Sequence, residues 1–220
     1  EEPQVCSLDE MQWASAISED RDAKAAADTV TGAVRGQLGG PDPDLAFLFC
    51  AEAHRPAYER LVARVRERLP GVLLIGCSAR SVIGGGREVE GRAALSLTVA
   101  RLPGVALRPM RVAGDGFPRG IDSWREHFEI DAVPDPHFVL FADPWSCDAE
   151  SLVRQLDADF PDSTVIGGLA SGVPGSARCH HSGRHGGHGR QRLRRNLVGL
   201  CQAGNGLLRH LPHERHHSRS

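Results

Sequence analysis

Aromatic residues are scarce in this chain. They make up 5% of its 220 residues and include a single tyrosine, whereas hydrophobic residues make up 40%, so any core is built mainly from aliphatic side chains. Lysine is nearly absent too, with one lysine among 26 basic residues, which is typical of a GC-rich coding sequence. The chain also lacks an apolar run long enough to cross a bilayer and lacks a secretory signal sequence. We therefore expect a cytoplasmic protein without a membrane partner.

No two of the six cysteines form a CxxC pair. Several lie inside apolar runs, which favours buried free thiols in a reducing compartment. The segment 179–188 combines Cys179 with four histidines, but their spacing matches no standard zinc site. We expect neither a metal nor a cofactor.

Charge is unevenly distributed along the chain. Residues 1–172 hold 17 basic and 27 acidic residues, a net charge of −10, whereas residues 173–220 hold nine arginines and one glutamate, a net charge of +8. An acidic main portion argues against a nucleic-acid partner.

The segment 173–220 differs from the rest in composition as well. It contains eight of the 11 histidines and no aromatic residue, and a mixture of Arg, His, Gly and Ser without a period cannot bury a core. We expect a disordered tail or a stretch read out of frame. Only Leu193–Leu200 has enough apolar residues to dock, as a helical turn or a stray strand. The folded domain is then expected over residues 11–172.

One stretch of that domain occurs twice. Residues 44–80 align without a gap to residues 135–171, at an offset of 91, and ten of the 37 aligned positions are identical, where chance gives about two or three. Each copy reads as a buried strand, an amphipathic helix and a second strand that ends in glycine. We predict two strand–helix–strand units related by a pseudo-two-fold axis within one sheet.

The residues around the two copies predict further elements. A first strand is expected at Gln12–Ile17, then a helix that begins near Ser18 and ends before Gly39. Between the copies, an alternating strand at 95–99 and a strand at 105–112 flank Pro103-Gly104 and predict an inserted hairpin. The overall prediction is an α/β fold with duplicated units in a mixed sheet.

Several familiar motifs are missing. The sequence Gly76-Cys77-Ser78-Ala79-Arg80 has no glycine in fifth place, so it is not a nucleophile elbow. The run Gly84-Gly85-Gly86-Arg87 is neither a GxGxxG fingerprint nor a P-loop, which weakens dinucleotide and nucleotide readings. A plain loop or an anion cradle both remain open there.

Three segments nevertheless resemble a known family. They are WASAISEDRDAKAAADTV near the start, LPGVLLIGCSARSVIGGGREVEGRAALSLTVARLPG in the middle and FPDSTVIGGLASG later. Together they resemble the N-terminal part of a FIST domain, over residues 10–172. The resemblance implies a bacterial sensory module of signal transduction that binds a small ligand such as an amino acid and acts on a downstream signalling protein. The family brings no established catalytic residues.

The carboxyl ends of the duplicated strands are the expected binding crevice, because ligands of open α/β sheets bind at that edge. Asp143 follows the first strand of copy two and is expected either to hold a ligand amine or to cap the next helix. Arg80 or Arg87 is the expected partner of a ligand carboxylate, because guanidinium binds carboxylate with two hydrogen bonds. The expected ligand-binding residues are Cys77, Ser78, Arg80, Gly84, Gly85, Arg87, Asp143, Gly168 and Ser171.

Two other functions stay open at this point. One is a hydrolase or transferase with Cys77 or Ser78 as the nucleophile, which would need a histidine base. The other is a protein-interaction scaffold without a small ligand. We favour the non-catalytic sensor.

Overall fold

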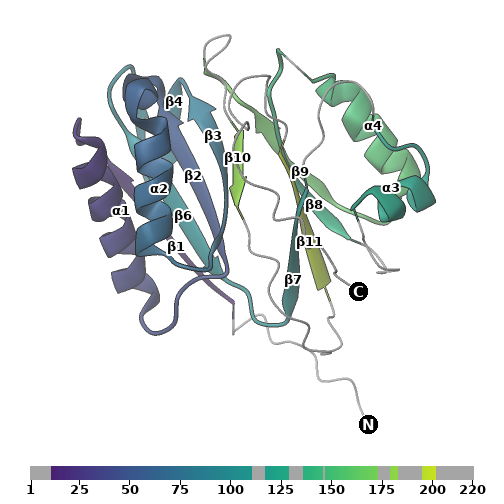
Figure 1. Cartoon of the computed structure of the whole chain (residues 1–220), viewed down its shortest axis with the longest axis horizontal. Coiled ribbons are helices and arrows are strands. Elements are labelled where there is room, and N and C mark those ends of the chain that lie inside the picture. The colour runs from purple at the N-terminus through teal and green to yellow at the C-terminus, as the bar shows by residue number, and fades with distance from the viewer. Residues whose placement is uncertain are drawn as a thin grey trace, which may run out of the picture.

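The computed structural model describes residues 11–110, 117–128, 136–145, 147–172, 179–182 and 195–201. Within them, two sheets lie face to face, and helices cover the outer side of each sheet (Figure 1). This confirms the predicted α/β class. The elements are β1 (Gln12–Ser18), α1 (Ala23–Leu38), β2 (Leu45–Ala51), the 3₁₀ helix η2 (Glu52–Ala57), α2 (Tyr58–Arg68), β3 (Leu73–Ala79), β4 (Ser81–Gly84), β5 (Arg87–Glu90), β6 (Leu95–Arg101), β7 (Val105–Met110), α3 (Ile121–Phe128), β8 (His137–Ala142), α4 (Ala149–Asp159), β9 (Val165–Leu169), β10 (Cys179–Ser182) and β11 (Arg195–Cys201).

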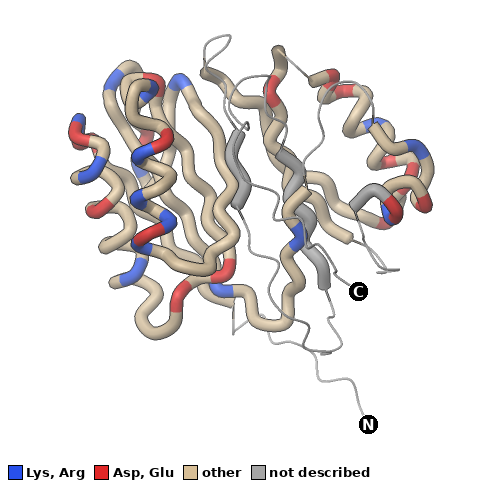
Figure 2. The backbone as a smooth tube through the Cα atoms, viewed as in Figure 1, with Lys and Arg blue, Asp and Glu red and all other residues tan. Residues whose placement is uncertain are grey.

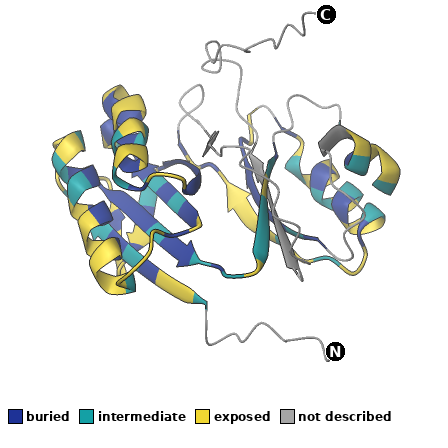
Figure 3. Cartoon of the chain, turned by 60° about the horizontal axis from the view of Figure 1, so that its bottom comes forward, coloured by how far each residue is buried: buried dark blue, intermediate teal, exposed yellow. Residues whose placement is uncertain are grey.

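The first sheet has the order β1-β6-β2-β3-β10. Strand β6 pairs antiparallel with both β1 and β2, while β2 and β3 are parallel. Helices α1 and α2 pack on its outer face through small aliphatic side chains such as Ala26, Val30 and Leu61, which are fully buried. The exposed positions of these helices lie on the side away from the sheet (Figure 3). Helix α1 begins four residues later than expected, because Asp22, not Ser18, accepts a hydrogen bond from the backbone of Ala25.

The second sheet has the order β7-β11-β8-β9 and is parallel throughout. Helices α3 and α4 cover its outer face (Figure 1) around the fully buried ring of Trp124. The indole N–H of Trp124 donates to Asp159 at 2.7 Å, so α3 is tied to the end of α4.

Both copies of the duplication form strand–helix–strand units, as predicted. They are β2–α2–β3 and β8–α4–β9, and helices α2 (58–68) and α4 (149–159) correspond at the offset of 91. The placement in one sheet is wrong, because the first unit lies in the first sheet and the second unit in the other. The gapless alignment also needs one correction. Gly76 pairs with Leu48 and Gly167 with Leu140, so copy two is one residue shorter between its first strand and its helix.

The two sheets meet through a core between the units. Side chains of β3 such as Ile75 and Cys77 pack there with Val139 and Phe141 of β8. The ring of Phe141 meets the rings of Phe47 and Phe49 edge-on, with centroids 5.8 and 5.5 Å apart. Each unit therefore buries one sheet face against its helices and the other against its partner unit.

The predicted hairpin lies elsewhere in the chain. Strands β6 and β7, which were expected to pair, belong to different sheets. The hairpin is formed by β4 and β5 around Gly85 and Gly86, whose φ values are +54° and +75°. Two consecutive positive φ angles are what a tight two-residue hairpin turn requires.

Two described strands fall within residues 173–220. β11 overlaps Leu193–Leu200, the segment for which a helical turn or an isolated strand was predicted, and it lies between β7 and β8. β10 was not expected, and it pairs antiparallel with β3. The remaining residues of this segment, including His185 and His188, lie outside the described residues.

Candidate functional site

The ends of β3 and β9 meet at the junction of the two units. The backbone N–H of Arg80 donates to Oγ of Ser171 at 3.1 Å. These residues occupy equivalent positions in the two copies, since 171 − 80 = 91. Contact between equivalent positions is what a pseudo-two-fold axis near them produces. The structure thus brings together the two strand ends that the sequence analysis chose as the binding crevice.

The Arg80 side chain is exposed at this junction and forms no ion pair with any residue that the structure describes. Asp143, 4% exposed, lies beyond β8, where its carboxylate accepts a hydrogen bond from the backbone of Trp145 at 3.0 Å. It does not cap α4, as the sequence allowed, because Asp148 takes that position and accepts from Ser151.

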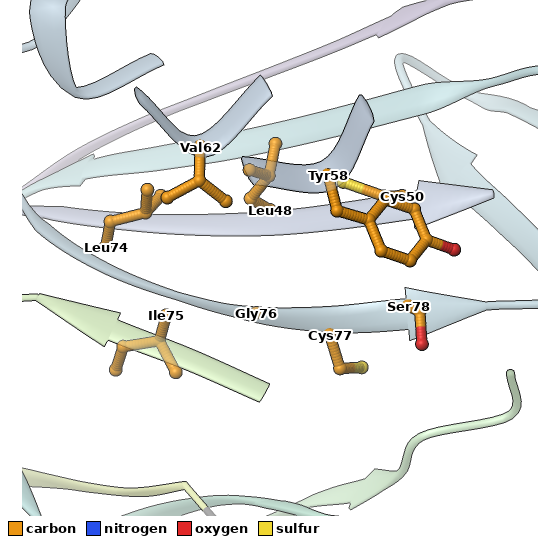
Figure 4. Close-up of a pocket in the computed structure, with 9 residues that line it drawn as sticks. All are labelled: Leu48, Cys50, Tyr58, Val62, Leu74, Ile75, Gly76, Cys77 and Ser78. Atoms are coloured by element: carbon orange, nitrogen blue, oxygen red, sulfur yellow. The ribbon is translucent and has the colours of Figure 1, made fainter. Parts of the chain in front are cut away.

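Cys77 and Ser78 lie on β3 and are buried. They border a cavity of about 20 Å³ beneath Tyr58 of α2 (Figure 4), which is space for a single water molecule. The Tyr58 hydroxyl donates to the backbone carbonyl of Ala51 at 3.4 Å, and burial of that phenol is the main reason that its pKa is raised. Burial likewise raises the pKa of the neighbouring Cys50 thiol. This part of the predicted site is a packed core with no room for a ligand in the present arrangement.

The glycine hairpin packs against the first sheet. A side chain at Gly84 would bring Cβ within 2.5 Å of Ser96 Oγ, and the backbone N–H of Gly85 lies 3.4 Å from Ser15 Oγ. Arg87 donates to Glu19 at 3.1 Å, and Arg92 binds the other oxygen of the same carboxylate at 2.9 Å. Gly84 and Gly85 therefore serve the packing of the hairpin on the first sheet, and Arg87 already has a carboxylate partner.

Two adjacent glycines of β9 differ in their surroundings. A Cβ at Gly167 would lie 1.8 Å from the carbonyl oxygen of Leu140, whereas a Cβ at Gly168 would meet nothing within 4 Å. Gly76 shows the same close approach to the Leu48 carbonyl. The close approach of the paired strand thus requires glycine at positions 76 and 167, whereas position 168 has room for a side chain.

A groove that was not predicted from the sequence lies on the helical side of the first sheet. It has a volume of about 750 Å³ and lies between the loop after β1 and the segment η2–α2. His54 borders it and is 2% exposed. The feature of the sequence that could have indicated this groove is the presence of charged residues after two strands. They are Arg21 and Asp22 after β1, and Glu52 to Arg55 after β2. The lining residues are Arg21, Asp22, Ala23, Lys24, Ala53, His54, Pro56, Ala57, Arg60, Ala63, Arg64 and Glu67.

Within the described part of the chain, no group of three or more His, Cys, Asp or Glu side chains is placed to hold a metal ion. None of the helices described there combines the length and apolarity needed to cross a membrane.

Comparison with known proteins gives consistent matches. The chain is 28% identical over 156 residues to an uncharacterized protein of Mycobacterium tuberculosis, covering 71% of this chain and 40% of that protein. It is 26% identical over 151 residues to an uncharacterized protein of Mycobacterium bovis, covering 69% of this chain and 38% of the relative. The chain thus spans about two fifths of the length of these relatives. No solved structure matches significantly.

The sequence profile of the FIST N domain matches residues 44–212. This match includes both strand–helix–strand units and extends past residue 172, where the resemblance found in the sequence ended. The family consists of sensory domains of signal transduction. Because the match covers well over half of the chain, the protein belongs to the FIST N domain family.

Proposed function

We propose that this chain is the ligand-binding part of a sensory protein and that its ligand is a small carboxylate such as an amino acid. The ligand binds at the junction of the two units, with Arg80 as its carboxylate partner. The observation that carries this proposal is the hydrogen bond from Arg80 N–H to Ser171 Oγ. A ligand seated there touches both units at once, so its binding energy can change how they pack.

The chemistry of the junction supports a carboxylate. The Arg80 guanidinium is exposed and without an ion pair among the described residues, so it can bind both oxygens of a carboxylate in a planar pair of hydrogen bonds. The Ser171 hydroxyl can donate to a ligand while it accepts from Arg80 N–H. A Cβ at Gly168 of β9 would meet nothing within 4 Å. Asp143, which follows the neighbouring strand β8, is the residue that we propose to receive a ligand amine.

The site is proposed as non-catalytic, without a cofactor. A nucleophile at Cys77 or Ser78 would have to leave the packed surroundings of β3, where the adjoining cavity holds about one water molecule. The buried positions of Cys50, Cys77 and Cys147 suit cysteines that act as small apolar residues in the reducing cytoplasm. The output is a change in the contact of this domain with a downstream signalling protein.

A thermal-shift screen of the amino acids and small dicarboxylates, followed by calorimetry of each hit, tests the proposal. Arg80→Ala should weaken binding by about 1.5–3 kcal/mol, the contribution of a charge-assisted hydrogen bond. Arg87→Ala is the matched control, because Arg87 is already paired with Glu19 and its loss should leave the affinity unchanged.

The result that would refute the site is a ligand whose affinity is the same in Arg80→Ala as in the original chain. The absence of any hit favours an interaction scaffold. Rapid labelling of Cys77 by a thiol reagent in the folded protein favours an enzyme, because a reactive thiolate must be accessible.

A further inference from the structure

The groove beside α1 and α2 lies where a ligand site is expected in this architecture. Strands β1 and β2 run in the same direction on either side of the antiparallel β6, so the loops that follow them leave the same edge of the sheet. Crevices between such loops are the usual binding places of open α/β sheets. A volume of about 750 Å³ is within the ordinary range for small-molecule sites.

The charge of the groove favours an anion. Its lining contains four basic and two acidic side chains. Arg64 is already held by Asp28 at 2.7 Å and Glu67 at 2.8 Å, and Lys24 is held by Asp28. Arg21 and Arg60 form no ion pair with any residue of the described ranges. Charged residues lie along both helices, whereas β2 and β3 carry none (Figure 2).

Among the described residues, the acidic side chains of the lining form no ion pair with Arg21 or Arg60. The Asp22 carboxylate accepts from the backbone of Ala25 as the cap of α1, and Glu67 accepts from Arg64. The guanidinium groups of Arg21 and Arg60 are therefore available at the rim to donate hydrogen bonds to a ligand.

His54 supplies a second and independent observation. It is 2% exposed, and its Nε2 is buried without a hydrogen-bond partner among the residues that the structure describes. An unpartnered buried polar atom costs stability, and such atoms are uncommon in folded proteins. An oxyanion bound in the groove, which His54 lines, would supply the missing partner.

We propose that this groove is a second binding site, for a small multivalent oxyanion that presents carboxylate or phosphate oxygens. Arg21 and Arg60 bind the anion at the rim, and His54 Nε2 binds it at the base. The site is separate from the junction at Arg80, and evidence for or against a ligand at that junction does not decide whether an anion binds here.

Calorimetric titration of the full chain with citrate and with inorganic phosphate, at low ionic strength and neutral pH, tests this site. We expect at least one of them to bind, and the preferred probe distinguishes a carboxylate from a phosphate ligand. Arg60→Gln should weaken that binding by about tenfold or more. Arg66→Gln removes the same charge from the same helix outside the groove lining and should change the affinity by less than about twofold.

Two substitutions at His54 distinguish a hydrogen bond from Nε2 to the anion from a general effect of changing the side chain. The amide of glutamine reaches the position of Nε2, whereas that of asparagine reaches only the position of Nδ1. His54→Gln should therefore retain binding within about threefold, and His54→Asn should lose about tenfold or more. Thermal unfolding of each variant verifies that it is folded. The proposal is overturned if neither anion binds at concentrations up to about 20 mM, or if Arg66→Gln weakens binding as much as Arg60→Gln.

Discussion

The adjacent glycines Gly167 and Gly168 allow a sharp test of how β9 is held. Replacing Gly167 by alanine places Cβ 1.8 Å from the carbonyl oxygen of Leu140, whose carbonyl carbon and nitrogen lie at 2.7 and 2.8 Å. These are backbone atoms of the paired strand β8, so no side-chain rotation relieves the clash. The φ angle of +147° adds strain for any residue with a Cβ.

The expected cost combines the two effects. Overpacking costs about 1–3 kcal/mol, and a backbone angle in a sparsely populated region costs about 1–3 kcal/mol more. Gly167→Ala should therefore lower the free energy of unfolding by roughly 2–6 kcal/mol. For a chain of this length, this corresponds to a fall in Tm of about 4 °C or more.

The control for this prediction is the next residue along the strand. Gly168→Ala meets nothing within 4 Å and has an ordinary φ angle, so its effect should stay within about 0.5 kcal/mol of zero or be slightly stabilising. Urea unfolding of both variants, followed by circular dichroism, measures the difference. Equal midpoints for the two alanine variants would mean that β8 and β9 are not paired in this register.

Three further predictions concern packing and pH. Phe141→Ala empties the ring-lined core between the sheets and should cost about 3–5 kcal/mol in urea unfolding; a loss below about 1 kcal/mol would argue against contact between the sheets. Burial lowers the pKa of His54 from 6.5, so stability should decline as pH falls below that value, because the unfolded chain takes up the proton first. His54→Leu should abolish that decline and, by removing the unpartnered Nε2, raise the unfolding free energy at neutral pH by about 1 kcal/mol; an unchanged pH profile would contradict this. Hydrogen bonds from Arg64 and then Lys24 lower the pKa of Asp28 from 3.8 to about 2, so the stability it contributes is present above pH 3.8 and lost as pH falls through about 2, and the acid-induced drop in urea midpoint should be smaller in Asp28→Asn.

Much of the local structure was predictable from the sequence. The helices α2 and α4 were predicted as the amphipathic helices of the two copies, because their apolar residues are spaced on one face. The duplication was visible because ten of the 37 aligned positions are identical, among them Gly76 and Gly167, which each meet the backbone of the paired strand closely. These close approaches lie within a single strand–helix–strand unit, so the sequence repeat carries them.

The arrangement of the units was not predictable in the same way. Both a single sheet and two stacked sheets bury the apolar runs of β3 and β8 on both faces, so the pattern alone does not distinguish them. The edge contacts of Phe141 with Phe47 and Phe49 decide in favour of stacking, and they join residues about 90 positions apart. The same limit explains why the sequence analysis paired β6 with β7, which lie in different sheets, and why it overlooked His54, whose significance depends on a buried atom without a partner.

Stacking of the two units bears directly on how a sensor of this kind could work. A ligand shifts an equilibrium only if it interacts differently with two arrangements of the protein. Within each unit the sheet and helices share one packed core, which leaves little room for alternatives. Between the units, the described contacts are the core around Phe141 and the hydrogen bond that joins Arg80 to Ser171 at the edge of that core. A ligand held by Arg80 would replace or reinforce the contact at the edge, where a small displacement changes the packing of the sheets.

The groove at His54 lies on the other side of the first sheet and within one unit, so an anion there would stabilise that unit without acting on the junction. The two proposed sites would thus differ in the consequence of binding. A ligand at the first would alter how the units pack, whereas an anion at the second would raise the stability of the unit that carries it.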